Sequence, residues 1–338
     1  TVPRSHSLTT DMRYGSISLA GMKGEINLLG RNNDISLTQC SAVRRIENDY
    51  GTTTLEDCSG TLELTGKSST ISVTRFGGPV TLDADYSTIT LKNIDRPVSL
   101  SSRSAKVACT DINGNLTVKS NYSTITADRI RGVFDVTNHS GSVRVRQVEG
   151  LIVSAPYSTV HASGISGKGG AETVVQGQSG SIELEDVGGS VTIDNPYGNV
   201  TLRNIRGSVE VAGKSSRITA EGIGGDWKSR TEYATVIVRD LRGKSVRISN
   251  RSNPVEISLA VVPTDLTIRN EYGNVNVTMP GGFSGTVNLD AEHGSIDTDL
   301  PITVKNRGGS AYGIGTVGSG SGSINVETLS GSIRIHRR

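Results

Sequence analysis

Apolar residues recur along the chain in a fixed frame of about 18 residues. One copy of the frame has Ile89 and Leu91 two positions apart, then a single Ile94, then Val98 and Leu100, again two apart. Residues two apart on a strand point to the same face, so each pair predicts the inward side of a short strand. The single residue between the pairs predicts a corner. Nothing in the frame has helical spacing, and the sequence therefore predicts an all-β fold.

A tyrosine begins every second frame, as in Tyr86-Ser-Thr-Ile-Thr-Leu, and a serine begins the frame between, as at Ser104. The frames thus form a double repeat of about 36 residues, a period that indicates a solenoid or a propeller. The tyrosines of this series are Tyr50, Tyr86, Tyr122, Tyr157, Tyr197, Tyr233 and Tyr272. In stacked coils their rings would recur roughly 9.6 Å apart. This regularity predicts a structural ladder better than it predicts catalytic groups.

A coil of two short strands cannot bury its own apolar face, so successive coils must stack and pair each strand with its equivalent in the next coil. Counting frames from Ile17 to Ile324 predicts about 17 coils in a single parallel β-solenoid domain covering residues 1–338. A propeller would need four strands per blade joined by hairpins, which the direct repeat of the frame does not favour. We expect loops or irregular coils near 163–180, 260–283 and 305–323, the last of them as a long or flexible glycine- and serine-rich segment.

Composition narrows the classes of function. The 338 residues carry a formal net charge of +2, with arginines interleaved among acids, so we expect no nucleic-acid partner. No apolar run reaches the ~20 residues of a membrane span. The chain shows no signal peptide and no initiator Met, and we expect a mature or trimmed product whose upstream signal or anchor could have been removed.

Three cysteines, an odd number, argue against a disulfide framework. Cys40 and Cys58 occupy the same corner position in adjacent coils and should stack. They could form a disulfide if their geometry suits it, or pack as two small apolar thiols. Cys109 falls in another column and should be a lone buried thiol.

Motifs for catalysis or cofactors are weak. Gly313-Ile-Gly-Thr-Val-Gly318 matches a dinucleotide-binding fingerprint, but no helical pattern follows it, so we expect a loop. None of the histidines stands at zinc-ligand spacing, and no nucleophile motif is present. We therefore expect no catalytic, cofactor-binding or metal-binding residues and no enzyme activity.

Acidic and amide residues recur just before the corner residue, at Asp57, Asn93, Asp111, Asp186, Asn204 and Asp240. Such a column could bind cations or sugar, but it more often hydrogen-bonds the backbone of its own turn.

Hydroxyl residues form an outward stripe beside the first pair of each frame, at Thr52, Thr54, Thr70, Ser72, Thr88, Thr90, Thr124 and Thr126. A flat hydroxyl ladder can bind glycan, ice or mineral, although Thr is also simply a good residue for an exposed strand. Lys106 and Arg144 interrupt the stripe, which counts against ice.

The pattern Tyr-Ser-Thr-Ile-Thr-Leu-x-x-Ile-x-Gly-x-Val-x-Leu, with the closing Ser330-Gly-Ser-Ile-Arg-Ile, resembles the bacterial DUF4097 β-strand-repeat family over almost the whole chain. That family is related to adhesin-like β-helix proteins described as autotransporter head domains, and it offers no catalytic residues to carry over. The resemblance implies a right-handed parallel β-helix and an extracytoplasmic, secreted or envelope-associated setting in a bacterium.

We therefore expect a non-enzymatic structural or adhesin-like β-solenoid that presents a polar surface at the bacterial cell envelope to a protein or glycan. The first alternative is a self-assembling subunit of an extracellular filament that associates through the solenoid ends. The second is a glycan-active enzyme, which would need carboxylates clustered in a groove.

Overall fold

The structure is a computed structural model that describes residues 4–338 as two compact units. Unit 1 ends at Ser166, and unit 2 runs from Gly167 to Arg338. The boundary lies inside the segment 163–180 that was expected to be irregular, next to the short 3₁₀ turn η1 (Lys168–Gly170). The grouping of both units into one domain stays a prediction, and each unit is described by itself.

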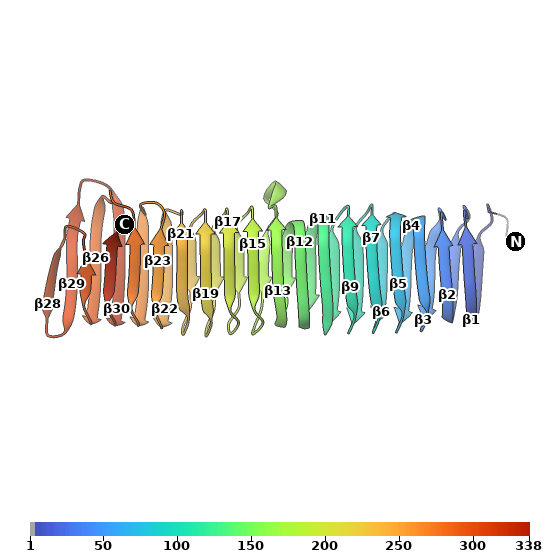
Figure 1. Cartoon of the computed structure of the whole chain (residues 1–338), viewed down its shortest axis with the longest axis horizontal. Coiled ribbons are helices and arrows are strands. Elements are labelled where there is room, and N and C mark those ends of the chain that lie inside the picture. The colour runs from blue at the N-terminus through green and yellow to red at the C-terminus, as the bar shows by residue number, and fades with distance from the viewer. Residues whose placement is uncertain (1–3) are drawn as a thin grey trace. The chain divides into compact units, whose positions relative to one another are not determined.

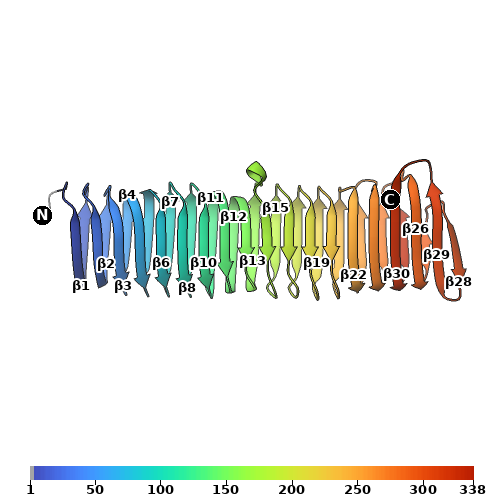
Figure 2. The ribbon, with the colours of Figure 1, turned by 180° about the vertical axis from the view of Figure 1, so that it is seen from behind.

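Unit 1 is built from parallel strands that follow one another in chain order, as Figure 2 shows. Among its described residues they are β1 (Leu8–Ala20), β2 (Ile26–Thr38), β3 (Val43–Asp49), β4 (Thr52–Lys67), β5 (Thr70–Gly77), β6 (Val80–Asp85), β7 (Thr88–Ile94), β8 (Val98–Arg103), β9 (Lys106–Ile112), β10 (Leu116–Asn121), β11 (Ser123–Asn138), β12 (Ser140–Ser154) and β13 (Tyr157–Ile165).

Each coil contributes one strand to each of two layers. In the first layer, β7 pairs with β5 and β9, which aligns Ile89 with Ile71 and Val107. In the second layer, β8 pairs with β6 and β10, which aligns Val98 with Val80 and Leu116. The long strands β4, β11 and β12 pass through a corner and belong to both layers. From β2 onward the inward apolar residues of both layers are buried, which confirms the predicted coil frame.

The corners combine left-handed backbone with close packing of neighbouring coils. Asp57 and its equivalents up the column have positive φ, near 55°, a region that Asn and Asp tolerate better than most residues. Gly60, two residues after the corner residue, has φ 145°. A Cβ on Gly78 would lie 1.9 Å from the carbonyl oxygen of Gly60 in the coil beside it. Glycine is required here because the two backbones touch.

A column of buried polar side chains lies behind the corner that carries the tyrosines. Its asparagines are Asn33, Asn48, Asn138, Asn195, Asn250 and Asn270, all 4% exposed or less. The carboxamide of Asn138 donates to the backbone oxygen of Ser123 at 2.9 Å and to Oγ of Ser158 at 3.2 Å. It also accepts the backbone N–H of Ser123 at 3.2 Å. These amides join adjacent coils and satisfy buried backbone groups at the corner.

Unit 2 has the same two layers. Its strands are β14 (Thr173–Gln176), β15 (Ile182–Val187), β16 (Val191–Asp194), β17 (Val200–Ile205), β18 (Val209–Ala212), β19 (Arg217–Ile223), β20 (Trp227–Arg230), β21 (Thr235–Leu241), β22 (Ser245–Ser252), β23 (Val255–Leu259), β24 (Asp265–Tyr272), β25 (Val275–Met279), β26 (Gly285–His293), β27 (Ile296–Thr298), β28 (Thr303–Arg307), β29 (Ser310–Val317), β30 (Gly322–Ser330) and β31 (Ile333–Arg337).

The last coil of unit 2 is stacked out of chain order. β30 pairs in parallel with both β24 and β26, and β31 likewise joins β25 and β27. Figure 1 shows β30 beside β26, with β29 and β28 at the end of the unit. The C-terminal coil therefore lies between two coils that precede it in sequence. Ile324 is consequently a second-layer residue aligned with Leu266 and Val287, and counting it as the start of a coil was wrong.

The glycine-rich segment 305–323 also differs from the expectation of a loop or flexible coil. Strand β29 lies at its centre and pairs antiparallel with β26 and with β28, and the segment also contains the end of β28 and the start of β30. The glycines at alternate positions of β29 let the strand pack closely against Ile302. A Cβ on Gly315 would come within 2.8 Å of the Ile302 side chain. Because this segment adds no parallel coil, the solenoid has about 15 turns, fewer than the number counted from the sequence. The segment 260–283 was also expected to be irregular. It contains two regular strands, β24 and β25, and only the short connections before, between and after them lie outside strands.

Candidate ligand-binding surfaces

The hydroxyl stripe is assembled on the outer face of the first layer of unit 1. The strand register places Thr52, Thr70 and Thr88 in one row. It places Thr54, Ser72 and Thr90 in a second, parallel row. Thr124 and Thr126 continue both rows after a coil in which Lys106 and Ala108 stand instead. All eight predicted side chains are exposed or half-buried. The structure thus brings them together, and ligand binding by the stripe stays a prediction.

The tyrosine column follows the corner between the second layer and the first layer of the next coil. In unit 1, Tyr50, Tyr86, Tyr122 and Tyr157 are 48%, 51%, 62% and 48% exposed. The tyrosines of unit 2, Tyr197, Tyr233 and Tyr272, are also about half exposed. The rings therefore lie on the surface with one side open to solvent. Some have polar neighbours, such as His139, whose ring centre is 5.1 Å from that of Tyr157.

The corner backbone does not itself require tyrosine. Tyr50, Tyr86 and Tyr122 have φ between 55° and 59°, a left-handed conformation that bulky side chains rarely adopt. Ser68 and Ser104 hold the same corner, with φ of 54° and 53°, in the coils between them. A residue as small as serine is therefore sufficient for the turn. Strained conformations of this kind cluster at functional sites, which makes the column a candidate binding surface.

A hollow of about 280 Å³ opens on the second layer of unit 1, beside this column. It is lined by Asp85, Ser101, Ser102, Arg103, Lys119, Ser120, Asn121 and Thr137. Tyr86, Ser104 and Tyr122 directly follow three of these lining residues in the chain. The hollow therefore lies next to the place where serine replaces a ring between two tyrosines. Sequence reasoning missed it because its lining residues come from four different strands.

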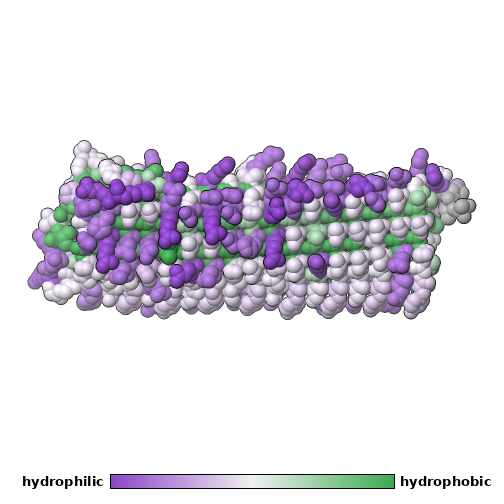
Figure 3. All heavy atoms as spheres, in the orientation of Figure 1, coloured by the Kyte–Doolittle hydropathy of each residue, from purple (hydrophilic) through white to green (hydrophobic). Residues whose placement is uncertain are grey.

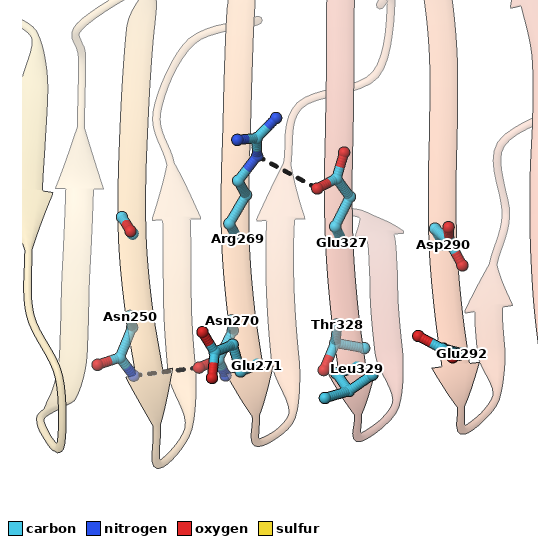
Figure 4. A pocket seen from close by; sticks show the side chains of 10 residues that line it. Asn250, Arg269, Asn270, Glu271, Asp290, Glu292, Glu327, Thr328 and Leu329 are labelled. Carbon is cyan, nitrogen blue, oxygen red and sulfur yellow. Dashed lines mark hydrogen bonds and ion pairs between the residues drawn. The ribbon is translucent and has the colours of Figure 1, made fainter.

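A second hollow of about 350 Å³ lies on the second layer of unit 2 and is predominantly acidic (Figure 4). Register places Glu327 of β30 between Arg269 of β24 and Asp290 of β26. Arg269 Nε contacts Glu327 Oε2 at 3.2 Å, as the dashed line in Figure 4 marks. Burial, together with the negative charges of Glu327 and Glu292, raises the pKa of Asp290. One oxygen of Asp290, Oδ1, is buried without a hydrogen-bond partner.

The column of acidic and amide residues that was considered as a cation or sugar site lines neither of these two hollows. Its members lie one above another at the corner and bond along the column. Arg129 Nε donates to Asp111 Oδ1 at 2.6 Å, and this hydrogen bonding holds the pKa of Asp111 below its usual value. In unit 2, Asn204 donates to Asp186 Oδ1 at 3.0 Å. Asp111 and Asp186 thus bond to the next coil, whereas Asp240 accepts from Arg242 of its own turn at 3.3 Å.

The stacked cysteines occupy the predicted corner. The backbone N–H of Cys40 donates to Sγ of Cys58 at 3.4 Å, and both thiols are buried and free. In this structure the two side chains pack as free thiols, and the choice between thiols and a disulfide stays a prediction. Cys109 is also buried and free, as predicted. The glycine motif at 313–318 falls mostly on strand β29. It thus has no strand-to-helix turn for a dinucleotide.

Apolar side chains gather at the end of unit 2 that β28 and β29 form (Figure 3). Tyr312 and Ile314 of β29 are 46% and 67% exposed there. No helix among residues 4–338 is long and apolar enough to cross a membrane. Within the same residues, no group of three or more His, Cys, Asp and Glu side chains is placed to hold a metal ion.

The two units define a class of protein, the parallel β-solenoid with exposed side-chain ladders. A sequence model of the family described as Toastrack DUF4097 matches residues 80–336, which is most of the chain. The chain therefore belongs to the Toastrack DUF4097 family. No curated protein and no solved structure matches it. The relation to adhesin-like proteins stays a prediction.

Proposed function

We propose that this chain is a non-enzymatic β-solenoid that presents a polar surface to a glycan or protein partner at the bacterial cell envelope. The observation that carries the proposal is the pair of exposed ladders in unit 1, the hydroxyl stripe and the tyrosine column. Both repeat in register with the coils, so the backbone hydrogen bonds hold their spacing. A surface ordered in advance loses little conformational entropy when an extended partner binds along it.

The envelope setting rests on the family resemblance drawn from the sequence. Fractionation of the cells that make the protein, followed by immunoblotting, tests it. Recovery in the cytoplasmic fraction alone would remove this part of the proposal and leave the surface-binding part standing.

The binding function is tested with the purified chain on a glycan array and in a pull-down from an envelope extract. Binding that weakens when Thr70, Thr88 or Tyr86 is replaced by Ala or Ser supports the proposal. A parallel incubation with a panel of polysaccharides tests the enzymatic alternative, for which the acidic hollow of unit 2 supplies carboxylates. Cleavage of any of them that is lost in Asp290→Asn would show an enzyme instead.

Self-association is the other candidate function, and the outer edge of β1 favours it. Among residues 4–338, β1 pairs only with β2, which leaves 13 residues with an open strand edge. An edge of this length can template pairing with another chain. At the end of unit 2, by contrast, β29 covers β26 with an antiparallel pairing, which counts against a filament that continues its coils there. Sedimentation velocity across a concentration series tests it, and a strict monomer would refute it.

A further inference from the structure

The hollow of unit 1 has positive charge in its lining and lies beside two tyrosines, Tyr86 and Tyr122, which directly follow the lining residues Asp85 and Asn121. Tyr86 and Tyr122 stand two coils apart, roughly 9.6 Å along the stack, and Ser104 leaves the space between them open. Arg103 and Lys119 line the hollow and are exposed. Neither has an ion-pair partner within 4.0 Å among residues 4–338. The hollow therefore carries two exposed positive charges that are not engaged by acids.

The floor of the hollow rests on buried hydroxyl groups that point inward, those of Ser102, Ser120 and Ser123. Ser102 Oγ lies 3.0 Å from Ser120 Oγ, and Ser120 in turn bonds to Ser123. Ser123 Oγ accepts the backbone N–H of Ala105 at 2.9 Å. The floor is therefore tied to the first strand of the following coil and does not have to reorganise when a ligand binds.

The hollow of unit 2 provides the opposite electrostatic case. It has Glu271, Asp290, Glu292 and Glu327 around one arginine, which is already paired with Glu327. An anion would be repelled there, whereas the hollow of unit 1 has two free cations and one carboxylate, that of Asp85. The ligand that fits the hollow of unit 1 is thus anionic, extended and rich in hydroxyl groups.

We propose that the hollow beside Tyr86 and Tyr122 binds an acidic polysaccharide, with sugar rings stacked on the two tyrosines and carboxylates paired with Arg103 and Lys119. The proposal rests on the proposed surface-binding function and names its ligand class. A sugar ring presents C–H groups on its faces, which suit the π-surface of tyrosine, and hydroxyls at its edge, which suit Ser101 and Asn121. A single-stranded nucleic acid also stacks on aromatic rings, but it needs a groove with more cations and without the Asp85 carboxylate.

The test is the affinity of the full chain for polygalacturonate, measured by isothermal titration calorimetry and affinity electrophoresis. The variants are Tyr86→Ser with Tyr122→Ser, and Arg103→Ser with Lys119→Ser. Serine is already the corner residue at 104, so the tyrosine variants should fold, which circular dichroism checks. We expect each double variant to weaken binding about tenfold or more. Binding should also weaken as salt increases, because the charge pairs are solvent-exposed.

Matched controls come from the same chain. Lys92→Ser removes an exposed lysine from the first layer, Tyr312→Ser a half-exposed ring of unit 2 that lies outside the tyrosine column, and Asp290→Asn a charge from the acidic hollow. None of them should change the affinity. Neutral dextran should bind at least tenfold more weakly than polygalacturonate.

Three results would overturn the proposal. They are an absence of polygalacturonate binding, equal losses in the control variants, and tighter binding of single-stranded oligonucleotides than of polygalacturonate. If the array or the pull-down still detects another partner, the surface-binding function stands and only the ligand class and site assigned here are wrong.

Discussion

Asn138 offers the sharpest test of how coils are held together at the tyrosine corner. Its side chain is fully buried and makes three hydrogen bonds, two with the backbone of Ser123 and one with the hydroxyl of Ser158. Ser123 begins the same long strand, β11, that Asn138 ends, whereas Ser158 lies in β13, so the amide ties the two ends of one coil to a later coil. Replacing Asn138 with Ala removes all three bonds and leaves polar groups of Ser123, which is itself buried, with fewer partners.

The magnitude follows from the number of groups affected. A hydrogen bond contributes about 1 kcal/mol net, and a buried polar group left unpaired costs about 1–3 kcal/mol. We therefore expect Asn138→Ala to lower the free energy of unfolding of unit 1 by about 2–4 kcal/mol. Asn113→Ala is the control, because Asn113 is exposed. Among residues 4–338 its backbone N–H donates to the carbonyl oxygen of Ile94, and its side chain makes no hydrogen bond. It should change stability by less than about 0.5 kcal/mol.

Urea unfolding followed by circular dichroism measures the loss. The fluorescence of Trp227, the single tryptophan, reports on unit 2 separately. Native-state hydrogen exchange should show faster exchange at the Ser123 amide in Asn138→Ala. If that amide stays protected and the two asparagine variants unfold together, the buried amides do not hold the coils and the reasoning is wrong.

Three further predictions concern other parts of the chain. Gly78→Ala should destabilise unit 1 by about 1–3 kcal/mol, because its Cβ would meet the Gly60 carbonyl, whereas Gly281→Ala, with open space around it, should be neutral in the same urea titration. Asp290→Asn should raise the melting temperature at pH 7. Folding raises the pKa of Asp290, so the carboxyl stabilises the native state only when it is protonated, and this contribution is lost as pH rises. The gain in melting temperature should therefore disappear below pH 3.8, the ordinary pKa of an Asp carboxyl. A gain that persists in acid would contradict this. Burial raises the pKa of the Cys58 thiol to about 11 and that of Cys109 to about 12, so iodoacetamide at pH 7.5 should label them only after denaturation, as mass spectrometry can show.

The coil frame was predictable because every coil has to bury the same apolar positions against its neighbours. Ile71, Ile89 and Val107 repeat at one spacing, and a parallel stack converts that spacing directly into register. The stacked thiols of Cys40 and Cys58 and the rows of the hydroxyl stripe follow from the same rule. Any residue whose neighbours lie one frame away in the sequence could be placed without coordinates.

The candidate binding site was only partly predictable. The tyrosine column was visible in the sequence, but its half-exposed rings and strained backbone were not. The hollow next to it depends on which side chains of four strands leave space unfilled, and on whether Arg103 finds a partner. These are properties of side-chain packing, and a repeat pattern does not contain them. The buried asparagines were missed because polar residues at a corner look the same in sequence whether they face solvent or the interior.

The sequence by itself determined the two-layered coil, the identity of its inward residues and the rows of its outward ones, because strand alternation and an in-register period leave no other arrangement that buries the apolar face. Only the tertiary structure decided where chain order and stacking order differ. β30 and β31 enter between two earlier coils because their frame matches both neighbours equally well, so the sequence pattern contains no preference for one position in the stack. The same holds for the hollows and their charges, which arise between coils and belong to no single repeat.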